Sequence, residues 1–467
     1  MSQRIESGVP LSRSSLWKFQ EEYYQRRGPA AFSSGEVPWR VSSTPLAGRL
    51  MAELLEAYGQ DTGRPVEVLE LGGGSARFAF HVLRAAEELG LPLLYRFTDV
   101  SDSNLMAASV HPRLKPFLAD GRLVVERRDA LTPGRVAGGG DTAVCVVGNY
   151  LFDTLPHDVF EARDGEVREG RVTLEGPSLS EASWSFEYAA APLPPVVERF
   201  GRAMGQARFP WPTGAMACIE SLGEGPYVLV FSDKVITSRD RLRAMEPVPL
   251  ARHGSVSMTV NIPAIRAWWG WRPFFQPDPA TDTFGVFALT RGFRRGELRL
   301  FDAQYQATFA RSPALRLLAL VDEAVHTRPL PVPRALELLA VSRFDPDVFL
   351  RLASPLSEEI AKGVEDRWVA PLVEALSRVS EMHFELKEPY DVQLEVARLL
   401  HRLGQLSAAV EVYQRSIDER GESADALVAM AAARADLGAP AVARELLQRA
   451  IRVDPGHEPA RRLLAKL

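Results

Sequence analysis

An acidic residue and a run of glycines follow a short apolar segment, in the order Glu70-Leu71-Gly72-Gly73-Gly74-Ser75-Ala76. Glycines at 72 and 74 permit a tight turn and let the backbone approach a ligand closely. Dinucleotide-binding proteins use a similar turn, but Glu70 suits the ammonium group of a methionine moiety and would repel a pyrophosphate. The dinucleotide fingerprint also continues as G-x-G-x-x-G, whereas this chain has Ala76. The segment predicts a ligand-binding loop of Glu70, Gly72, Gly73 and Gly74; the alternative is a glycine-rich turn that binds nothing.

Two further acids end the next two predicted strands. Asp99 ends the segment 93–99, where a carboxylate can accept hydrogen bonds from both ribose hydroxyls of an adenosyl group. Asp129, followed by Ala130, ends the segment 123–129, where a side chain would lie beside an adenine amino group. Alone, each acid could be a solvated loop residue or a helix N-cap. Because open α/β sheets bind ligands at the carboxyl ends of their strands, the set predicts S-adenosyl-L-methionine as the cofactor.

The segment 148–157 follows the fourth predicted strand and is expected to face the methyl group and its acceptor. Asn149, which would also touch the cofactor, and Asp153 could orient a nucleophilic nitrogen or oxygen, and Asp153 or His157 could take its proton. The alternative is that Asp153 caps a turn and that His157 is exposed to solvent. The candidate substrate contacts are Tyr24, Tyr150 and Phe152.

A sheet must bring these strand ends together, and the pattern between residues 65 and 290 predicts one. Short apolar runs alternate with helical stretches such as 76–89. This alternation indicates parallel strands joined by crossover helices, a doubly wound, mostly parallel α/β sheet. About seventy-five residues separate the fourth strand from the fifth, which predicts an inserted cap with a hairpin at Asp164-Gly165. The predicted strands are 65–71, 93–99, 123–129, 141–149, 226–232 and 284–290.

Beyond residue 300 the chain is expected to be helical and to repeat itself. Gly404, Ala409, Tyr413 and Ser416 are followed 34 residues later by Gly438, Ala443, Leu447 and Ala450. Small residues at these points let two antiparallel helices pack closely. The period and the residues resemble the tetratricopeptide repeat, with 460–467 as a capping helix. Two repeats are fewer than usually stand alone, so the helices of 303–388 are expected to continue the stack in degenerate form.

The sequence thus predicts four regions. Residues 1–60 form an N-terminal helical or lid segment, and residues 61–300 form the methyltransferase domain with its cap. Residues 301–388 form a helical linker or degenerate repeats, and residues 389–467 form an all-α domain of tetratricopeptide-like repeats.

Composition narrows the classes of function. The 467 residues are 46% hydrophobic and 25% charged, with a formal net charge of −5. Because the chain has no surplus of basic residues to neutralise phosphates, nucleic acid is not expected as a partner. The two cysteines, Cys145 and Cys218, lie in apolar or small-residue surroundings, which predicts buried thiols and no zinc site. No secretory signal and no apolar run of about eighteen residues occurs, so no membrane span is expected and a cytoplasmic location is predicted.

The chain from about residue 20 to 295 resembles the MidA-like methyltransferases, a family of class I, Rossmann-like fold. The matching segments occur in the family's order: EEYYQRRG, VSSTPLAGRLMAELL, ELGGGSARF, GNYLFDTLPHDVFEARDGEVREG and ARHGSVSMTVNIPAIRAW. The resemblance implies S-adenosyl-L-methionine as cofactor and an arginine of a partner protein as acceptor. Tyr150 stands where the family usually has a glutamate, a natural partner for guanidinium, and Ser75-Ala76 replaces a second glycine. Asp233 stands near the place of the family's aspartate-tyrosine-glycine.

Three functions remain open at this point. The sequence favours the first, methylation of a protein side chain, arginine or another nitrogen, with the repeat helices docking the partner or forming a homodimer. The second is methylation of a small molecule beneath a lid of N-terminal aromatic residues, which a pocket closed by that segment would favour. The third is a non-catalytic scaffold that keeps the fold for assembly. The lid candidates are Trp17, Phe19, Tyr23, Tyr24 and Trp39.

Overall fold

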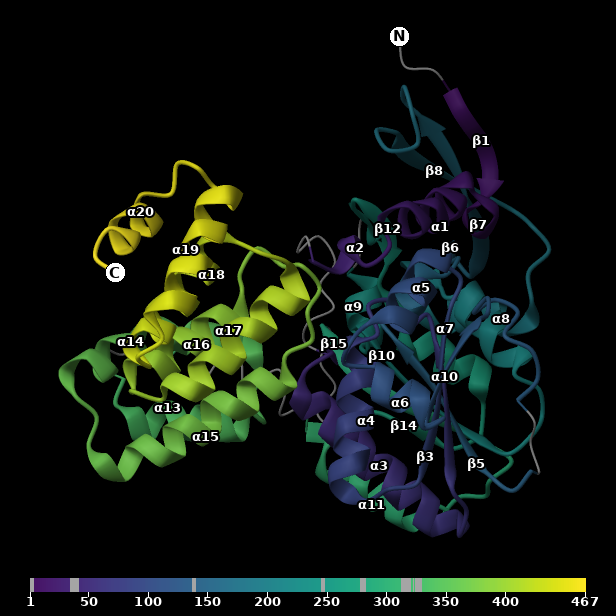
Figure 1. Cartoon of the computed structure of the whole chain (residues 1–467). Helices are drawn as coiled ribbons and strands as arrows, with labels where there is room; N and C mark the ends of the chain where they lie inside the picture. Colours follow the sequence, from purple (N-terminus) through teal and green to yellow (C-terminus); the bar gives the residue numbers. More distant parts are fainter. Residues whose placement is uncertain are drawn as a thin grey trace. The chain divides into compact units, whose positions relative to one another are not determined.

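In the computed structural model the chain folds into two compact units (Figure 1). The first contains Met1–Ser43 and Ala47–Pro313, and the second contains Thr44–Leu46 and Ala314–Leu467. The residues that the structure describes are 4–33, 42–136, 140–244, 248–277, 283–311, 321, 323 and 330–467. Helix α11 (Arg299–Ala307) therefore lies in the first unit, although the sequence suggested a helical linker from residue 301.

The first unit is built on an eight-stranded sheet with the order β14-β15-β10-β5-β2-β3-β4, in which β13 also pairs with β10. The run from β10 to β4 is parallel, which confirms the doubly wound, mostly parallel prediction. Strand β15 pairs antiparallel with both β10 and β14. The strands are β2 (Val66–Leu71), β3 (Leu93–Asp99), β4 (Leu123–Arg127), β5 (Ala143–Asn149), β10 (Tyr227–Ile236), β13 (Val260–Asn261), β14 (Phe274–Phe275) and β15 (Phe284–Arg291).

Crossover helices follow the strands, as the alternating pattern predicted. Strand β5 is buried along almost all of its length, as expected for a strand covered on both faces. Cys145 and Cys218 are both buried free thiols, as predicted. The helices of this unit after the N-terminal segment are α3 (Pro45–Thr62), α4 (Arg77–Leu89), α5 (Asp102–Val110), α6 (Lys115–Ala119), α7 (Pro195–Met204), α8 (Thr213–Ser221), α9 (Arg239–Arg243) and α10 (Ile262–Trp269), with the short turns η3 (Phe152–Thr154) and η4 (Phe309–Arg311).

The predicted insertion is a second, five-stranded antiparallel sheet. Asp164 and Gly165 form the predicted hairpin turn with φ of 52° and 80°, the left-handed pair that a two-residue turn requires. The sheet takes in β1 from the N-terminus, where the sequence analysis predicted no strand. Its strands are β1 (Arg4–Pro10), β6 (Asp158–Arg163), β7 (Glu166–Glu175), β8 (Ser183–Ala189) and β9 (Ala207–Trp211), and a separate hairpin pairs β11 (Leu250–His253) with β12 (Ser255–Met258).

Helix α1 (Ser15–Arg27) follows β1 and the turn η1 (Leu11–Arg13), and precedes α2 (Ala30–Ser33). Ser14 caps it by accepting the backbone N–H of Leu16. Trp17 and Phe19 pack into one apolar core with β6, β7 and β12. These aromatic residues therefore fix α1 against the inserted sheet, while Trp39 lies outside the described residues.

The second unit is helical, as predicted. The 34-residue repeat appears as two helix pairs, and Gly404 and Gly438 end the first helix of each pair with φ of 74° and 78°. Ala409, Ala443 and Ala450 are fully buried where the helices meet. The preceding helices share the same core. The helices are α13 (Val332–Val341), α14 (Pro346–Lys362), α15 (Asp366–Met382), α16 (Val392–Arg402), α17 (Leu406–Arg420), α18 (Ala424–Asp436), α19 (Pro440–Val453) and α20 (Glu458–Leu464). Within the described parts of both units, no helix is long and apolar enough to cross a membrane.

Replacing Ala443 by leucine tests the close packing of the repeat helices. Ala443 has no exposed surface, so three additional carbon atoms must displace neighbouring side chains. Overpacking of this kind costs about 1–3 kcal/mol in the free energy of unfolding. Ala441→Leu, an exposed position on the same helix, is the matched control and should change stability by less than about 0.5 kcal/mol in urea denaturation. Equal effects of the two substitutions would contradict the packing.

Candidate functional site

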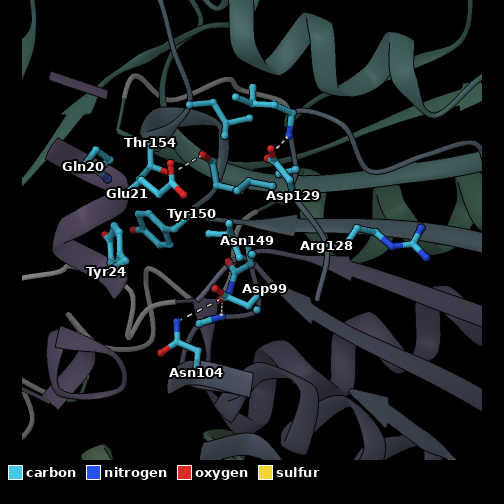
Figure 2. A pocket seen from close by; sticks show the side chains of 18 of the residues that line it. Gln20, Glu21, Tyr24, Asp99, Asn104, Arg128, Asp129, Asn149, Tyr150 and Thr154 are labelled. Carbon is cyan, nitrogen blue, oxygen red and sulfur yellow. Dashed lines mark hydrogen bonds between the residues drawn. The ribbon is translucent and has the colours of Figure 1, made fainter. Parts of the chain in front are cut away.

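A cavity of about 340 Å³ opens at the carboxyl ends of the parallel strands. Its walls come from the glycine loop after β2, the ends of β3, β4 and β5, and helix α1 (Figure 2). Strand β2 lies between β3 and β5, so this is the point at which the strand order reverses and where such sheets bind ligands.

The glycine loop has the backbone that its residues predict. Gly72 and Gly74 have φ of 63° and 59°, in the left-handed region that favours glycine. A Cβ on Gly73 would lie 2.1 Å from the ring of Phe97, so a side chain has no room there. Ala76 takes φ of 62° at the start of α4, at the position where the sequence lacks a further glycine. All three glycines line the cavity, as predicted.

Gly73→Ala should destabilise this loop. The new methyl group would collide with Phe97, a fully buried ring, so either the ring or the loop must move. We expect a loss of about 1–3 kcal/mol in the free energy of unfolding, measured in denaturant. Gly140→Ala is the control, because nothing lies within 4 Å of its added Cβ. Identical denaturation curves for the two variants would show that the loop accommodates the methyl group.

Asp99 holds the glycine loop and the next helix together. Its Oδ2 accepts the backbone N–H of Gly74 at 2.8 Å and the amide of Asn104 at 3.3 Å. Its Oδ1 accepts the N–H of Ser101 at 2.8 Å. Burial raises the pKa of this carboxyl, while these donors act to lower it. Asp99 lines the cavity at the place predicted for a ribose contact.

Glu70 lies beneath the loop and is not among the residues that line the cavity. Its side chain is 1% exposed, and burial raises its pKa to about 8. Its Oε2 has no hydrogen-bond partner among the described residues. The structure therefore places this acid behind the predicted ammonium site.

Asp129 and Ala130 line the cavity beyond the end of β4. The Oδ1 atom of Asp129 accepts the N–H of Leu131 at 2.8 Å, and its side chain remains exposed. The neighbouring Arg128 also lines the cavity, but its guanidinium extends away from the other labelled side chains and donates to the carbonyl of Pro133 (Figure 2).

Strand β10 fixes the segment that follows β5. The hydroxyl of Ser232 donates to Asn149 Oδ1 at 2.5 Å, and Asn149 Nδ2 donates to Ser43 at 3.3 Å. The backbone N–H of Tyr150 donates to the carbonyl of Ser232, and Tyr150 takes a strained φ of 49°. Its ring stacks on Phe284 with 5.3 Å between centroids. Asn149 and Tyr150 both line the cavity.

A buried pair of carboxyl groups lies under the same segment. Asp233 accepts the N–H of Phe152 at 2.9 Å and that of Asp153 at 3.3 Å. Burial, reinforced by the neighbouring Asp153, raises the pKa of Asp233 well above its usual value. Burial also raises the pKa of Asp153 to about 6, so Asp153 ionises first. Asp153 does not line the cavity, although Thr154 beside it does.

Two other predicted residues lie in the core. His157 is fully buried, which corrects the alternative that it is exposed to solvent. Its Nδ1 bonds with the carbonyl of Leu155 at 2.8 Å, its ring stacks on Trp17, and burial lowers its pKa to about 4. Phe152 is 1% exposed and packs against Phe231. Neither lines the cavity.

Helix α1 forms one wall of the cavity. Of its residues, the sequence predicted only aromatic ones to contribute to a lid. Tyr24, a predicted substrate contact, lines the cavity together with Trp17, Gln20 and Glu21 (Figure 2). The spacing of Trp17, Gln20, Glu21 and Tyr24 places them on one face of a helix. That periodicity is the signal by which Gln20 and Glu21 could have been found.

Comparison with known families matches two parts of the chain. Residues 46–225 match the family described as "Putative S-adenosyl-L-methionine-dependent methyltransferase". Residues 374–467 match the tetratricopeptide repeat, which agrees with the predicted repeat. No curated protein matches the chain.

Several solved structures are similar over part of the chain. Two are members of one superfamily from Burkholderia thailandensis. One of them is described as a "likely methyl transferase" and is bound to S-adenosyl-homocysteine. Both are 17% identical to this chain, and the similar region covers 62% of it. That region covers 89% of the first protein, with a TM-score of 0.45, and 90% of the second, with a TM-score of 0.44. The DszA carbon methyltransferase is 14% identical and covers 50% of this chain and 49% of its own, with a TM-score of 0.26. Structural similarity at this level does not assign a function to any residue of this chain.

Proposed function

We propose that this chain, whose residues 46–225 match a family of S-adenosyl-L-methionine-dependent methyltransferases, methylates a small acceptor molecule in the cavity beneath α1. The observation that carries the proposal is that α1 and the glycine loop line the same cavity. A pocket walled by an N-terminal helix restricts the acceptor to a small molecule or a slender group. Its volume of about 340 Å³ lies at the lower end of the range for ligand pockets, roughly 300–1,000 Å³.

The residues at the strand ends fit the cofactor. The backbone of Gly72 and Gly74 allows a close approach. Asp99 and Asp129 line the same cavity, which supports their proposed contacts with the ribose hydroxyls and the adenine. Bound S-adenosyl-L-methionine supplies an already activated methyl group, so the protein's main contribution is to hold the acceptor in line.

The acceptor side is held rigid by the protein's own hydrogen bonds. Ser232 and Ser43 fix both ends of the Asn149 amide, which can then orient a nucleophile. Asp153 is the proposed proton acceptor, because a pKa of about 6 leaves it ionised at neutral pH. It lies beneath the cavity lining, so the proton has to reach it past the lining residue Thr154. Its Oδ1 has no hydrogen-bond partner among the described residues. Burial lowers the pKa of His157 to about 4, so it is the weaker base, and it lies behind Trp17.

A second candidate function is methylation of a protein side chain. The tetratricopeptide match at residues 374–467 favours it, because stacked helix pairs commonly bind proteins. In that case the second unit would dock the partner, and one side chain would reach the cavity.

A transfer assay with a labelled methyl donor separates the two candidates. The full chain is incubated with either the small-molecule ultrafiltrate or the dialysed proteins of its source cells. Label in acid-soluble products from the ultrafiltrate supports the small acceptor, whereas label in precipitated protein supports the second candidate. Asp99→Ala protein serves as the blank. Absence of label from both fractions, although S-adenosyl-homocysteine binds, would reject both acceptor classes.

A further inference from the structure

The wall formed by α1 contains a buried amide with one end unpaired. Gln20 is 4% exposed, and its Oε1 accepts the backbone N–H of Val256 in β12 at 2.5 Å. Because a backbone N–H can only donate, this bond establishes which end of the amide is the oxygen. The remaining atom, Nε2, has no hydrogen-bond partner among the described residues.

A buried donor without a partner destabilises the folded protein. Gln20 lines the cavity, and Figure 2 shows it near Glu21 and Tyr24 of the same helix, with Tyr150 beside Tyr24. Nε2 itself has almost no exposed surface, so a group in the cavity reaches it when the amide turns toward the cavity about its bond to Val256.

We propose that Gln20 determines acceptor specificity by donating a hydrogen bond from Nε2 to a carbonyl oxygen of the acceptor, in the cavity that Trp17 and Tyr24 also line. This inference rests on the proposed function and names the chemical class of its substrate. The class is a neutral, planar carbonyl compound, such as an aromatic amide or ketone.

Charge favours a neutral carbonyl over a carboxylate. The buried Asp99 lines the cavity, and the Asp153–Asp233 pair lies under the loop beside it, so an anionic acceptor would meet repulsion that little water screens. Lys18 and Glu21 of the same wall are exposed, and their charges are correspondingly screened. A protonated amine offers no lone pair to Nε2.

Three probe molecules of one shape test the class: benzamide, benzoate and benzylamine. Their dissociation constants are measured by NMR titration of the full chain saturated with S-adenosyl-homocysteine. We expect benzamide to bind most tightly, and Gln20→Glu to weaken it by about tenfold, because the variant retains an acceptor for Val256 but loses the donor. Gln20→Leu should weaken benzamide similarly. Glu22→Gln, at an exposed position of the same helix outside the cavity lining, should change its binding by less than about twofold.

The affinity for S-adenosyl-homocysteine, measured on each protein, separates the possible failures. An unchanged affinity together with weaker benzamide binding supports the inference. A tenfold loss in Gln20→Glu would assign Nε2 to the cofactor and overturn it. Failure of benzamide to bind the wild type, tighter binding of benzoate or benzylamine, or equal binding of benzamide to both Gln20 variants and the wild type would also overturn it. A wild-type protein that does not bind S-adenosyl-homocysteine would instead refute the proposed function itself.

Discussion

Asp99→Ala should weaken the binding of S-adenosyl-homocysteine by about 100-fold or more. The substitution removes the predicted ribose contact and also frees the backbone N–H groups of Gly74 and Ser101. Hydrogen bonds to a charged group are worth about 1.5–3 kcal/mol each, and about 1.4 kcal/mol corresponds to tenfold in affinity. Isothermal titration calorimetry measures the effect.

Asp102→Ala is the matched control for this experiment. Asp102 begins the helix that follows Asp99, but its side chain is 71% exposed and pairs only with exposed Arg127 among the described residues. Its loss should change the affinity by less than about threefold. If Asp99→Ala bound within threefold of the wild type while retaining its circular dichroism spectrum, the ribose site would have to lie elsewhere.

Asp233→Asn should lower the stability of the first unit, most strongly at acidic pH. The carboxylate accepts the N–H groups of Phe152 and Asp153 with its two oxygens, and asparagine keeps only one of these oxygens. Its NH₂ group would face the other N–H, and two donors cannot form a hydrogen bond. The expected loss is about 1–3 kcal/mol in the free energy of unfolding.

The pH dependence of that loss tests the carboxyl pair. Both pKa values are higher in the folded state than in an unfolded chain, so the folded state binds more protons. The wild-type free energy of unfolding should therefore fall as pH rises from about 4 through 6 and beyond. The variant has one fewer titrating group, so its free energy of unfolding should fall less. The difference from the wild type, measured by urea denaturation, should therefore shrink over this range. Asp240→Asn, at an exposed carboxylate, is the control. A deficit that grows with pH would contradict the raised pKa values.

The sequence predicted the parts of the site that depend on local pattern. Apolar runs marked the parallel strands, and glycines at 72 and 74 marked a loop whose φ angles require them. The hairpin at Asp164-Gly165 was predicted for the same reason, since a two-residue turn has few suitable sequences.

Contacts between distant segments could not be predicted in this way. Ser232 and Asp233 hold the segment after β5 across 83 and 80 residues, and Val256 holds Gln20 across 236 residues. His157 gave no local signal of burial, because its environment comes from Trp17 in the N-terminal helix. The pairing of β1 was missed because Gly8 and Pro10 weaken the strand pattern.

The pairing of β1 with β7 has a consequence for the order in which the chain folds. The first strand leaves the ribosome early, yet Gly8 bonds to Thr173, 165 residues later. Until that partner is synthesised, β1 has an unpaired edge, and α1 lacks the sheet against which its aromatic residues pack. We therefore expect the parallel strands β2, β3 and β4 to form before the wall of the cavity. A nascent chain ending near residue 150 would leave Trp17 and Phe19 accessible to chaperones.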